Sequence, residues 1–192
     1  AIKIAMARPD LKITVLTKAV ADESNTRYAQ GGVAAVWNEK IDTEEKHIAD
    51  TLDAGDGLCN EEVVKMVVEE GPIRVRELIE WGTRFDKEKG GEYDLGREGG
   101  HSENRILHYK DITGWEIQRT ITEKAKQLPN IVIRENCFSI DLLTQHHLGY
   151  NITRVHPDIE CYGVYALDKN NLDVETHLAR ITVVATGGAG QI

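Results

Sequence analysis

The sequence predicts an α/β fold: a partial Rossmann-like parallel sheet with helices, of the nucleotide-binding kind, together with a small antiparallel sheet. Two observations lead to this prediction. Up to about residue 130, strand-like segments alternate with amphipathic helical segments, which is the pattern of a layered α/β sheet. Beyond residue 130 strand-like segments dominate, and two of them flank the turn residues Asp168 to Asn171, which is typical of an antiparallel hairpin.

The composition limits the class of protein. The 192 residues include 23 Lys and Arg and 32 Asp and Glu, which gives a formal charge of −9, and 41% are hydrophobic. This is typical of a soluble globular domain, and the acidic balance argues against nucleic acid or an anionic membrane as a partner. No apolar run approaches the ~20 residues that span a bilayer. Cys59, Cys137 and Cys161 are widely spaced, which favours a reducing compartment, and we expect the cytoplasm.

The chain is expected to open with a helix over residues 1–6 and a short buried strand over residues 12–17. A helix over residues 42–53 follows, and the pattern Asp42-x-x-Glu45 predicts a capping box at its start. A β-α-β unit requires a strand before the first helix, and the sequence has none there. We therefore expect the chain to begin inside a longer domain.

Two further helices are expected before residue 130. A long amphipathic helix over residues 61–81 has Asn60 as its N-cap, and Gly71-Pro72 should kink or split it. The pattern Thr113-x-x-Glu116 opens a second helix, which is expected to end near residue 128.

Short strands are expected through the rest of the chain. A loop over residues 146–157 interrupts them, and His146-His147 are expected to lie on it, exposed to solvent and without a metal. The last strand is followed at once by the glycine-rich residues 186–190, so we expect the chain to continue past residue 192. The expected strands cover residues 131–133, 137–144, 160–167, 173–178 and 181–185.

The first candidate binding segment is S-N-T-R-Y-A-Q-G-G-V-A-A over residues 24–35, which follows the first strand closely. Its hydroxyls, amides and two glycines are suited to present backbone N–H groups to a pyrophosphate or a heterocycle at close range. A surface turn is the alternative that spacing alone leaves open.

The second candidate is R-E-G-G-H-S over residues 97–102, inside a polar segment over residues 84–110 that we expect to be a long loop. Glu98 is suited to accept hydrogen bonds from a substrate ammonium group, and the glycines allow a small ligand to approach closely. A solvated polar loop is the alternative. The spacing of His101 and His108 matches no common pair of metal ligands, and we expect no metal site.

Three segments together resemble the L-aspartate oxidase family, flavoproteins of the succinate dehydrogenase and fumarate reductase superfamily. They are S-N-T-R-Y-A-Q-G-G-V-A-A-V, R-E-G-G-H-S-x-x-R-I-L-H-x-x-D-x-T-G and V-V-A-T-G-G-A-G. The resemblance covers essentially all 192 residues. It implies that residues 1–192 are part of the FAD-binding domain. The first strand, the Gly-x-Gly-x-x-Gly turn, the capping domain and the C-terminal helical domain are then missing.

The resemblance implies that FAD is a non-covalent cofactor. Asn25 stands where succinate dehydrogenases carry the histidine that is linked covalently to FAD. Lys18 is similar to a family FAD contact, while Phe138 and Ser139 fall where the family's backbone meets the adenine end. The residues that correspond to the segment wrapping the pyrophosphate and isoalloxazine are Asn25, Thr26, Arg27, Tyr28, Ala29, Gln30, Gly31 and Gly32.

Glu98 matches the carboxylate that orients L-aspartate in the family, and His101 and Ser102 are expected beside it in the substrate pocket. The dicarboxylate enzymes of the superfamily generally carry an apolar residue at this position. A carboxylate there repels succinate and attracts the α-ammonium group of aspartate. At ~4 Å and an effective dielectric constant near 20, the attraction is worth about 4 kcal/mol before desolvation.

The implied reaction is the oxidation of L-aspartate to iminoaspartate, with oxygen or fumarate as the electron acceptor. The product enters the quinolinate route to NAD, so quinolinate synthase is an implied partner. The resemblance places the catalytic base outside this chain, which alone we expect to be inactive. Two alternatives remain: a flavoprotein subunit of a fumarate reductase or succinate dehydrogenase, and a non-catalytic flavin-binding module.

Overall fold

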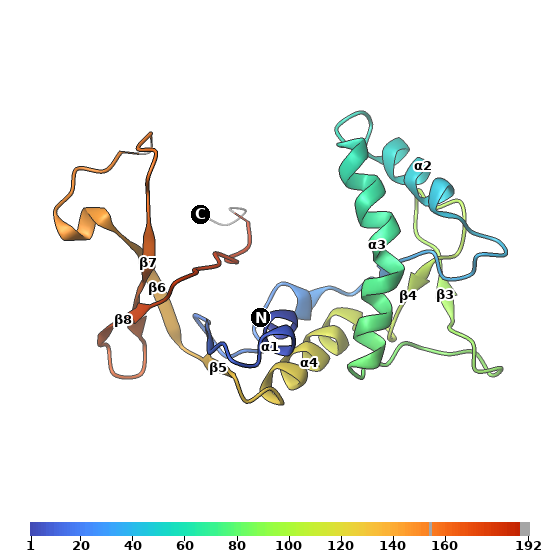
Figure 1. Ribbon diagram of the computed structural model, residues 1–192. Coiled ribbons are helices and arrows are strands. Elements are labelled where there is room, and N and C mark those ends of the chain that lie inside the picture. The colour runs from blue at the N-terminus through green and yellow to red at the C-terminus, as the bar shows by residue number, and fades with distance from the viewer. Residues whose placement is uncertain (154, 189–192) are drawn as a thin grey trace. The chain divides into compact units, whose positions relative to one another are not determined.

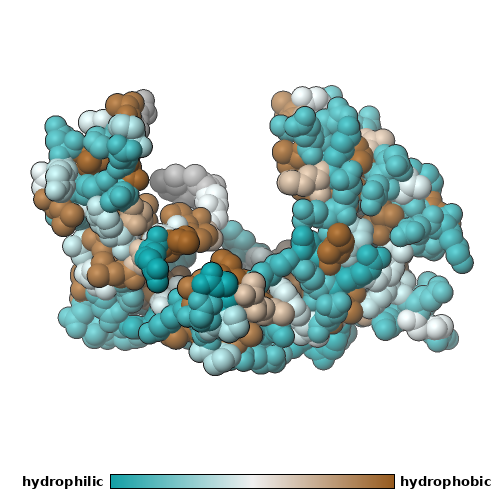
Figure 2. Space-filling model, in the orientation of Figure 1, coloured by the Kyte–Doolittle hydropathy of each residue, from teal (hydrophilic) through white to brown (hydrophobic). Residues whose placement is uncertain are grey.

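The computed structural model describes residues 1–153 and 155–188, which form two compact units (Figure 1). The first unit contains residues 3–21 and the chain from residue 130 onward, and the second unit contains residues 22–129. Hydrophilic residues dominate the surface in the view of Figure 2, as the net charge of −9 leads one to expect. The parallel strands, helices and antiparallel sheets confirm the predicted α/β class.

The first unit combines a parallel strand pair with an antiparallel sheet. Strand β1 (Ile13–Leu16) follows helix α1 (Ile2–Ala7) and pairs in parallel with β5 (Ile131–Arg134), with Ile13 opposite Ile131. The apolar, β-branched residues of both strands explain why they pair. The remaining elements of this unit are β6 (Cys137–Thr144), the 3-10 helix η2 (Gln145–Leu148), β7 (Cys161–Asp168) and β8 (Val174–Leu178).

Strands β6, β7 and β8 form an antiparallel meander in chain order. The predicted hairpin turn is confirmed, because Asp168 to Asn171 connect β7 to β8. The Asp168 side chain accepts a hydrogen bond from the backbone N–H of Asn170 at 2.8 Å, as turn-forming aspartates do.

The predicted strand over residues 181–185 is not present. The backbone there has no regular structure, and Ile181 and Val183 are 81% and 73% exposed. A strand forms only beside another strand that satisfies its backbone hydrogen bonds, and none of the described strands pairs with this segment. Of the glycine-rich residues that follow, Gly190 lies outside the described residues.

The second unit packs helices against a small sheet. Its elements are η1 (Thr26–Tyr28), β2 (Val33–Ala34), α2 (Glu44–Ala54), α3 (Glu61–Glu80), β3 (Leu95–Gly96), β4 (Ile106–Leu107) and α4 (Thr113–Lys126). The antiparallel sheet has the order β2-β4-β3. Ala35, Val75, Phe85 and Leu107 form a buried cluster that joins α3 to this sheet. The prediction of little regular structure over residues 84–110 is confirmed, since the named elements within this range are the two-residue strands β3 and β4.

Helix α3 is continuous, although Pro72 lies inside it. The N-cap prediction is confirmed, because the Asn60 side chain accepts a hydrogen bond from the N–H of Val63 at 3.2 Å. Proline removes one helical hydrogen bond, at a cost of ~3 kcal/mol. Pro72 lies on the buried face with Val68 and Val75, and this packing offsets the loss, so the helix is not split.

The capping box predicted at Asp42-x-x-Glu45 is wrong, whereas the helix predicted from Thr113 onward is confirmed as α4. Thr43 caps α2, because its side chain accepts a hydrogen bond from the N–H of Lys46, while Asp42 is fully buried in an ion pair. At α4 the Thr113 hydroxyl accepts from the N–H of Tyr109, and Glu116 is fully buried between two arginines. In both cases an acidic side chain forms a buried ion pair instead of a local cap.

Candidate functional site

The segment over residues 25–32 is built on the start of α4. Its single turn, η1, is closed by the Ser24 hydroxyl, which accepts a hydrogen bond from the N–H of Arg27 at 3.2 Å. The N–H of Gly114 donates to the carbonyl of Ala29 at 2.9 Å. A Cβ on Gly114 would lie 1.8 Å from the carbonyl oxygen of Thr26, so only glycine allows this close packing.

This segment presents polar groups to solvent. Asn25, Thr26 and Gln30 are exposed, and their side chains form no hydrogen bond to any residue within 1–153 or 155–188. Tyr28 is 64% exposed, and its hydroxyl donates to the Glu23 carboxylate at 2.9 Å. Amide and hydroxyl groups are therefore available here to a polar ligand.

The two glycines of the segment have different roles. A Cβ on Gly32 would lie 2.2 Å from Cγ2 of Ile106 and 2.5 Å from the carbonyl oxygen of Leu107, so Gly32 lets β2 approach β4. A Cβ on Gly31 would lie 3.1 Å from Oε1 of Glu98. The structure thus brings the Glu98 carboxylate beside the first candidate segment.

Glu98 lies on the connection between β3 and β4. It is exposed, and its side chain forms no ion pair with a described residue. Its carbonyl oxygen accepts a hydrogen bond from the N–H of His101 at 3.2 Å, and this contact closes the turn that contains Gly99 and Gly100. An exposed carboxylate without a cationic partner is available to a cationic group of a ligand.

Ser102 is held by α2. Its N–H and its hydroxyl both donate to Oδ2 of Asp50, each at 2.8 Å. The guanidinium of Arg105 also donates to the Ser102 hydroxyl, at 3.3 Å. The Ser102 side chain therefore anchors the turn, and these contacts give it a positioning role next to Glu98.

A buried arginine, Arg105, organises these contacts. The Arg105 side chain is fully buried, donates to Asp42 through Nε and Nη2 at 2.9 and 2.8 Å, and donates to Asp50 through Nη1 at 2.6 Å. Burial opposes ionisation of Asp50, but hydrogen bonds from Ser102 and Arg105 outweigh it and lower the pKa of Asp50 to about 2. We call Asp42, Asp50, Ser102 and Arg105 the Arg105 network.

Two histidines lie beside the Arg105 network. The rings of His47 and His101 meet edge to face, with their centroids 6.1 Å apart, and Nδ1 of each is buried without a hydrogen-bond partner in the described structure. Burial and the nearby Arg105 charge lower the pKa of His47, which favours its neutral form. His108 does not join them, because its Nδ1 lies 3.3 Å from Asp86 Oδ2.

The remaining predicted cofactor contacts belong to the first unit. Lys18 is exposed just after β1, and its carbonyl oxygen accepts a hydrogen bond from Nζ of Lys169 at 3.2 Å. Phe138 and Ser139 lie on β6 opposite Leu167 and Ala166 of β7. Phe138 is 47% exposed and Ser139 is exposed, so both are accessible to a ligand.

The chemistry of residues 25–32 fits a flavin. The ring system of FAD has carbonyl oxygens and ring nitrogens along its polar edge, and protein hydrogen bonds to these atoms orient it. The exposed groups of Asn25, Thr26 and Gln30 supply donors for that edge. The backbone of the two glycines allows a flat ring to approach closely.

The fold and this surface are those of a flavin-binding domain: the chain belongs to the FAD binding domain family, which matches residues 3–192. FAD is thus its cofactor. The chain is 45% identical over 180 residues to L-aspartate oxidase 2-a of Nicotiana tabacum, covering 94% of this chain and 27% of that protein. It is 42% identical over 188 residues to L-aspartate oxidase of Yersinia pestis, covering 96% and 34%.

Solved structures agree with the family. A mutant FrdA of E. coli quinol fumarate reductase has a TM-score of 0.86 at 30% identity, covering 98% of this chain and 30% of that one. The chain spans only about a quarter to a third of the length of the curated relatives named above. In the part of the chain that the structure describes, no helix is long and apolar enough to cross a membrane.

Proposed function

We propose that this chain is the flavin-binding part of an L-aspartate oxidase, which oxidises L-aspartate to iminoaspartate with oxygen or fumarate as the electron acceptor. One observation carries the proposal: the exposed carboxylate of Glu98 lies against Gly31, within the segment whose donors fit a flavin. The similarity to proteins named L-aspartate oxidase supports it.

The proposed role of Glu98 is to hold the α-ammonium group of the substrate. When bound, FAD takes the hydride that leaves the substrate Cα. Glu98 orients the amine, and the Arg105 network holds the turn on which Glu98 lies. The proton that leaves the amine passes to a base that we place outside these 192 residues.

The proposed cofactor contacts are the segment Asn25 to Gly32, with Lys18 and with Phe138 and Ser139 near the adenine end. FAD is held without a covalent bond, because Asn25 offers no ring nitrogen for a link to the flavin. The proposed substrate pocket also includes His101 and Ser102. Ser102 fixes the turn, and His101 lies one residue before it.

The proposed cellular role is the supply of iminoaspartate for quinolinate and hence NAD synthesis, in the cytoplasm and with quinolinate synthase as the consumer of the product. Three cysteines unpaired among the described residues fit a reducing compartment.

An alternative is a fumarate reductase or succinate dehydrogenase flavoprotein, which the similarity to FrdA favours. Glu98 argues against this alternative because its carboxylate repels a purely anionic substrate. Asn25 argues against it because succinate dehydrogenases carry the FAD-linked histidine at this position.

The substitution Glu98→Gln in the full-length enzyme tests the proposal. If half of the ~4 kcal/mol attraction survives desolvation, its loss lowers kcat/KM for L-aspartate by about thirtyfold. Fumarate reduction by the same variant should not fall, because fumarate has no ammonium group and the substitution removes the repulsion between Glu98 and the fumarate dianion. Glu92→Gln, also exposed and between residues 84 and 110, is the control. Equal loss of both activities in Glu98→Gln would contradict the orienting role.

A further inference from the structure

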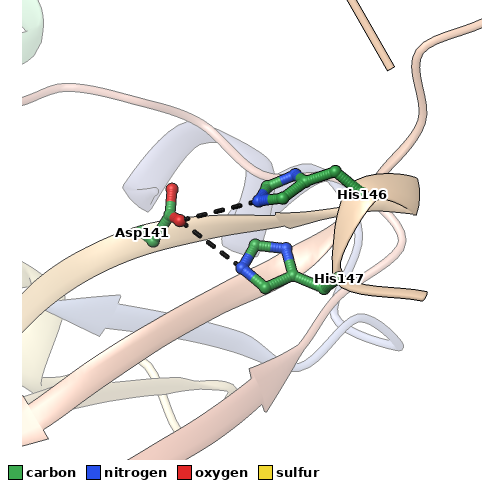
Figure 3. A group of neighbouring side chains, drawn as sticks. All are labelled: Asp141, His146 and His147. Atoms are coloured by element: carbon green, nitrogen blue, oxygen red, sulfur yellow. Dashed lines mark ion pairs between the residues drawn. The ribbon is translucent and has the colours of Figure 1, made fainter. Parts of the chain in front are cut away.

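Three ligand-type side chains meet on the antiparallel sheet of the first unit, at the end of β6 (Figure 3). Nε2 of His147 lies 3.4 Å from Oδ2 of Asp141, and Nε2 of His146 lies 3.9 Å from the same oxygen. All three residues are exposed, and their ligand atoms all lie within 4.8 Å of one another. The sequence predicts that His146 and His147 lie on a solvated loop and bind no metal.

The spacing of these atoms is close to that of a metal centre. In a tetrahedral site with metal–ligand bonds of about 2.0 Å, neighbouring ligand atoms lie about 3.3 Å apart. The His147–Asp141 distance already meets this value, and the His146–Asp141 distance exceeds it by a few tenths of an ångström. The ligand atoms lie within 4.8 Å of one another, so side-chain rotations must shorten the widest separation by up to about 1.5 Å to hold an ion.

Local contacts hold the two imidazole rings in place. Oγ1 of Thr144 lies 2.5 Å from Nδ1 of His146, and the N–H of Thr144 donates to Nδ1 of His147 at 3.4 Å. The rings lie with their centroids 3.7 Å apart, and His147 also packs edge to face on Tyr165 of β7 at 5.2 Å. These partners leave Nε2 of each ring facing the carboxylate, and the Thr144 hydroxyl is placed to accept the Nδ1–H of His146, as the partners of metal-binding histidines do.

We propose that Asp141, His146 and His147 form a binding site for a divalent transition-metal ion of the Zn²⁺ class, with water in the remaining position. Two imidazoles and one carboxylate suit Zn²⁺, Co²⁺ or Ni²⁺, whereas Mg²⁺ and Ca²⁺ prefer oxygen ligands alone. The ion links η2 to β6 and so fixes the position of η2 relative to this strand. The site does not depend on the proposed oxidase function.

Binding requires the other neutral tautomer of His147. In the metal-free protein Nδ1 of His147 accepts the Thr144 N–H, so the proton of the neutral ring is on Nε2, facing Asp141. An ion at Nε2 needs the lone pair of that nitrogen, so the proton moves to Nδ1 and the long contact from the Thr144 N–H is given up.

Isothermal titration of the 192-residue chain with ZnCl₂ tests this site. We expect one binding event that His147→Ala and Asp141→Asn each weaken at least tenfold. His156→Ala removes an exposed histidine of the same unit outside the cluster, and it should change the affinity less than twofold. Far-UV circular dichroism checks the fold of each variant.

A second measurement locates the ion independently of any variant. Substoichiometric Co²⁺ should broaden the amide NMR signals of residues 141–148 first. Zn²⁺ binding that is absent from the wild-type chain, or equally strong in all variants, overturns the proposal. Broadening centred elsewhere, for example at His47 and His101, overturns it as well.

Discussion

Replacing Arg105 by glutamine should destabilise the second unit strongly. The Arg105 and Asp42 side chains are fully buried, and the Asp50 side chain is 16% exposed. Removing the guanidinium leaves the Asp42 carboxylate buried without its two hydrogen bonds, and removal of one partner of a buried pair costs about 3–5 kcal/mol. The free energy of unfolding, measured by urea denaturation, should fall by that amount.

An exposed ion pair provides the matched control. Arg74 on α3 contacts Glu70 and Glu77 at 2.9 and 3.0 Å, but its side chain is 46% exposed. Exposed pairs contribute about 0–1 kcal/mol, so Arg74→Gln should lower the free energy of unfolding by less than 1 kcal/mol. If Arg105→Gln costs no more than Arg74→Gln, the assignment of Arg105 as the organiser of this site is wrong.

Two further predictions concern α4. Gly114→Ala places a Cβ 1.8 Å from the Thr26 carbonyl oxygen and should cost about 1–3 kcal/mol in urea denaturation, whereas Gly71→Ala in α3 meets no atom within 4 Å and should be neutral or mildly stabilising. Burial opposes ionisation of Glu116, but hydrogen bonds from Arg119 and Arg84 outweigh it and lower its pKa from 4.5 to about 2. The resulting stabilisation is complete above about pH 4.5 and is lost as the pH falls toward 2, and Glu116→Gln should flatten this part of a plot of Tm against pH.

The elements that the sequence predicted well are those whose signal is local. The Asn60 cap and the turn at Asp168 to Asn171 depend on residues within a few positions, and both are present. The prediction of a strand over residues 181–185 is wrong for the opposite reason. Its apolar pattern is suitable, but pairing depends on a neighbour that the pattern does not specify.

The motifs indicated a candidate site, but they did not indicate the contacts that support it. A motif indicated Glu98, and the structure brings this residue beside Gly31. The Arg105 network was missed because Asp42 stands three residues before Glu45, which is also the pattern of a helix cap. Only long-range contacts distinguish a cap from a buried ion pair, since Asp42 and Arg105 are far apart in sequence.

The turn around Glu98 has a consequence for how substrate preference can change. Asp50 secures this turn through Ser102 and Arg105, and Glu98 itself takes no part in those side-chain contacts. Under the proposed function, a substitution at position 98 therefore changes the group that faces the substrate and leaves the side-chain contacts that hold the turn in place.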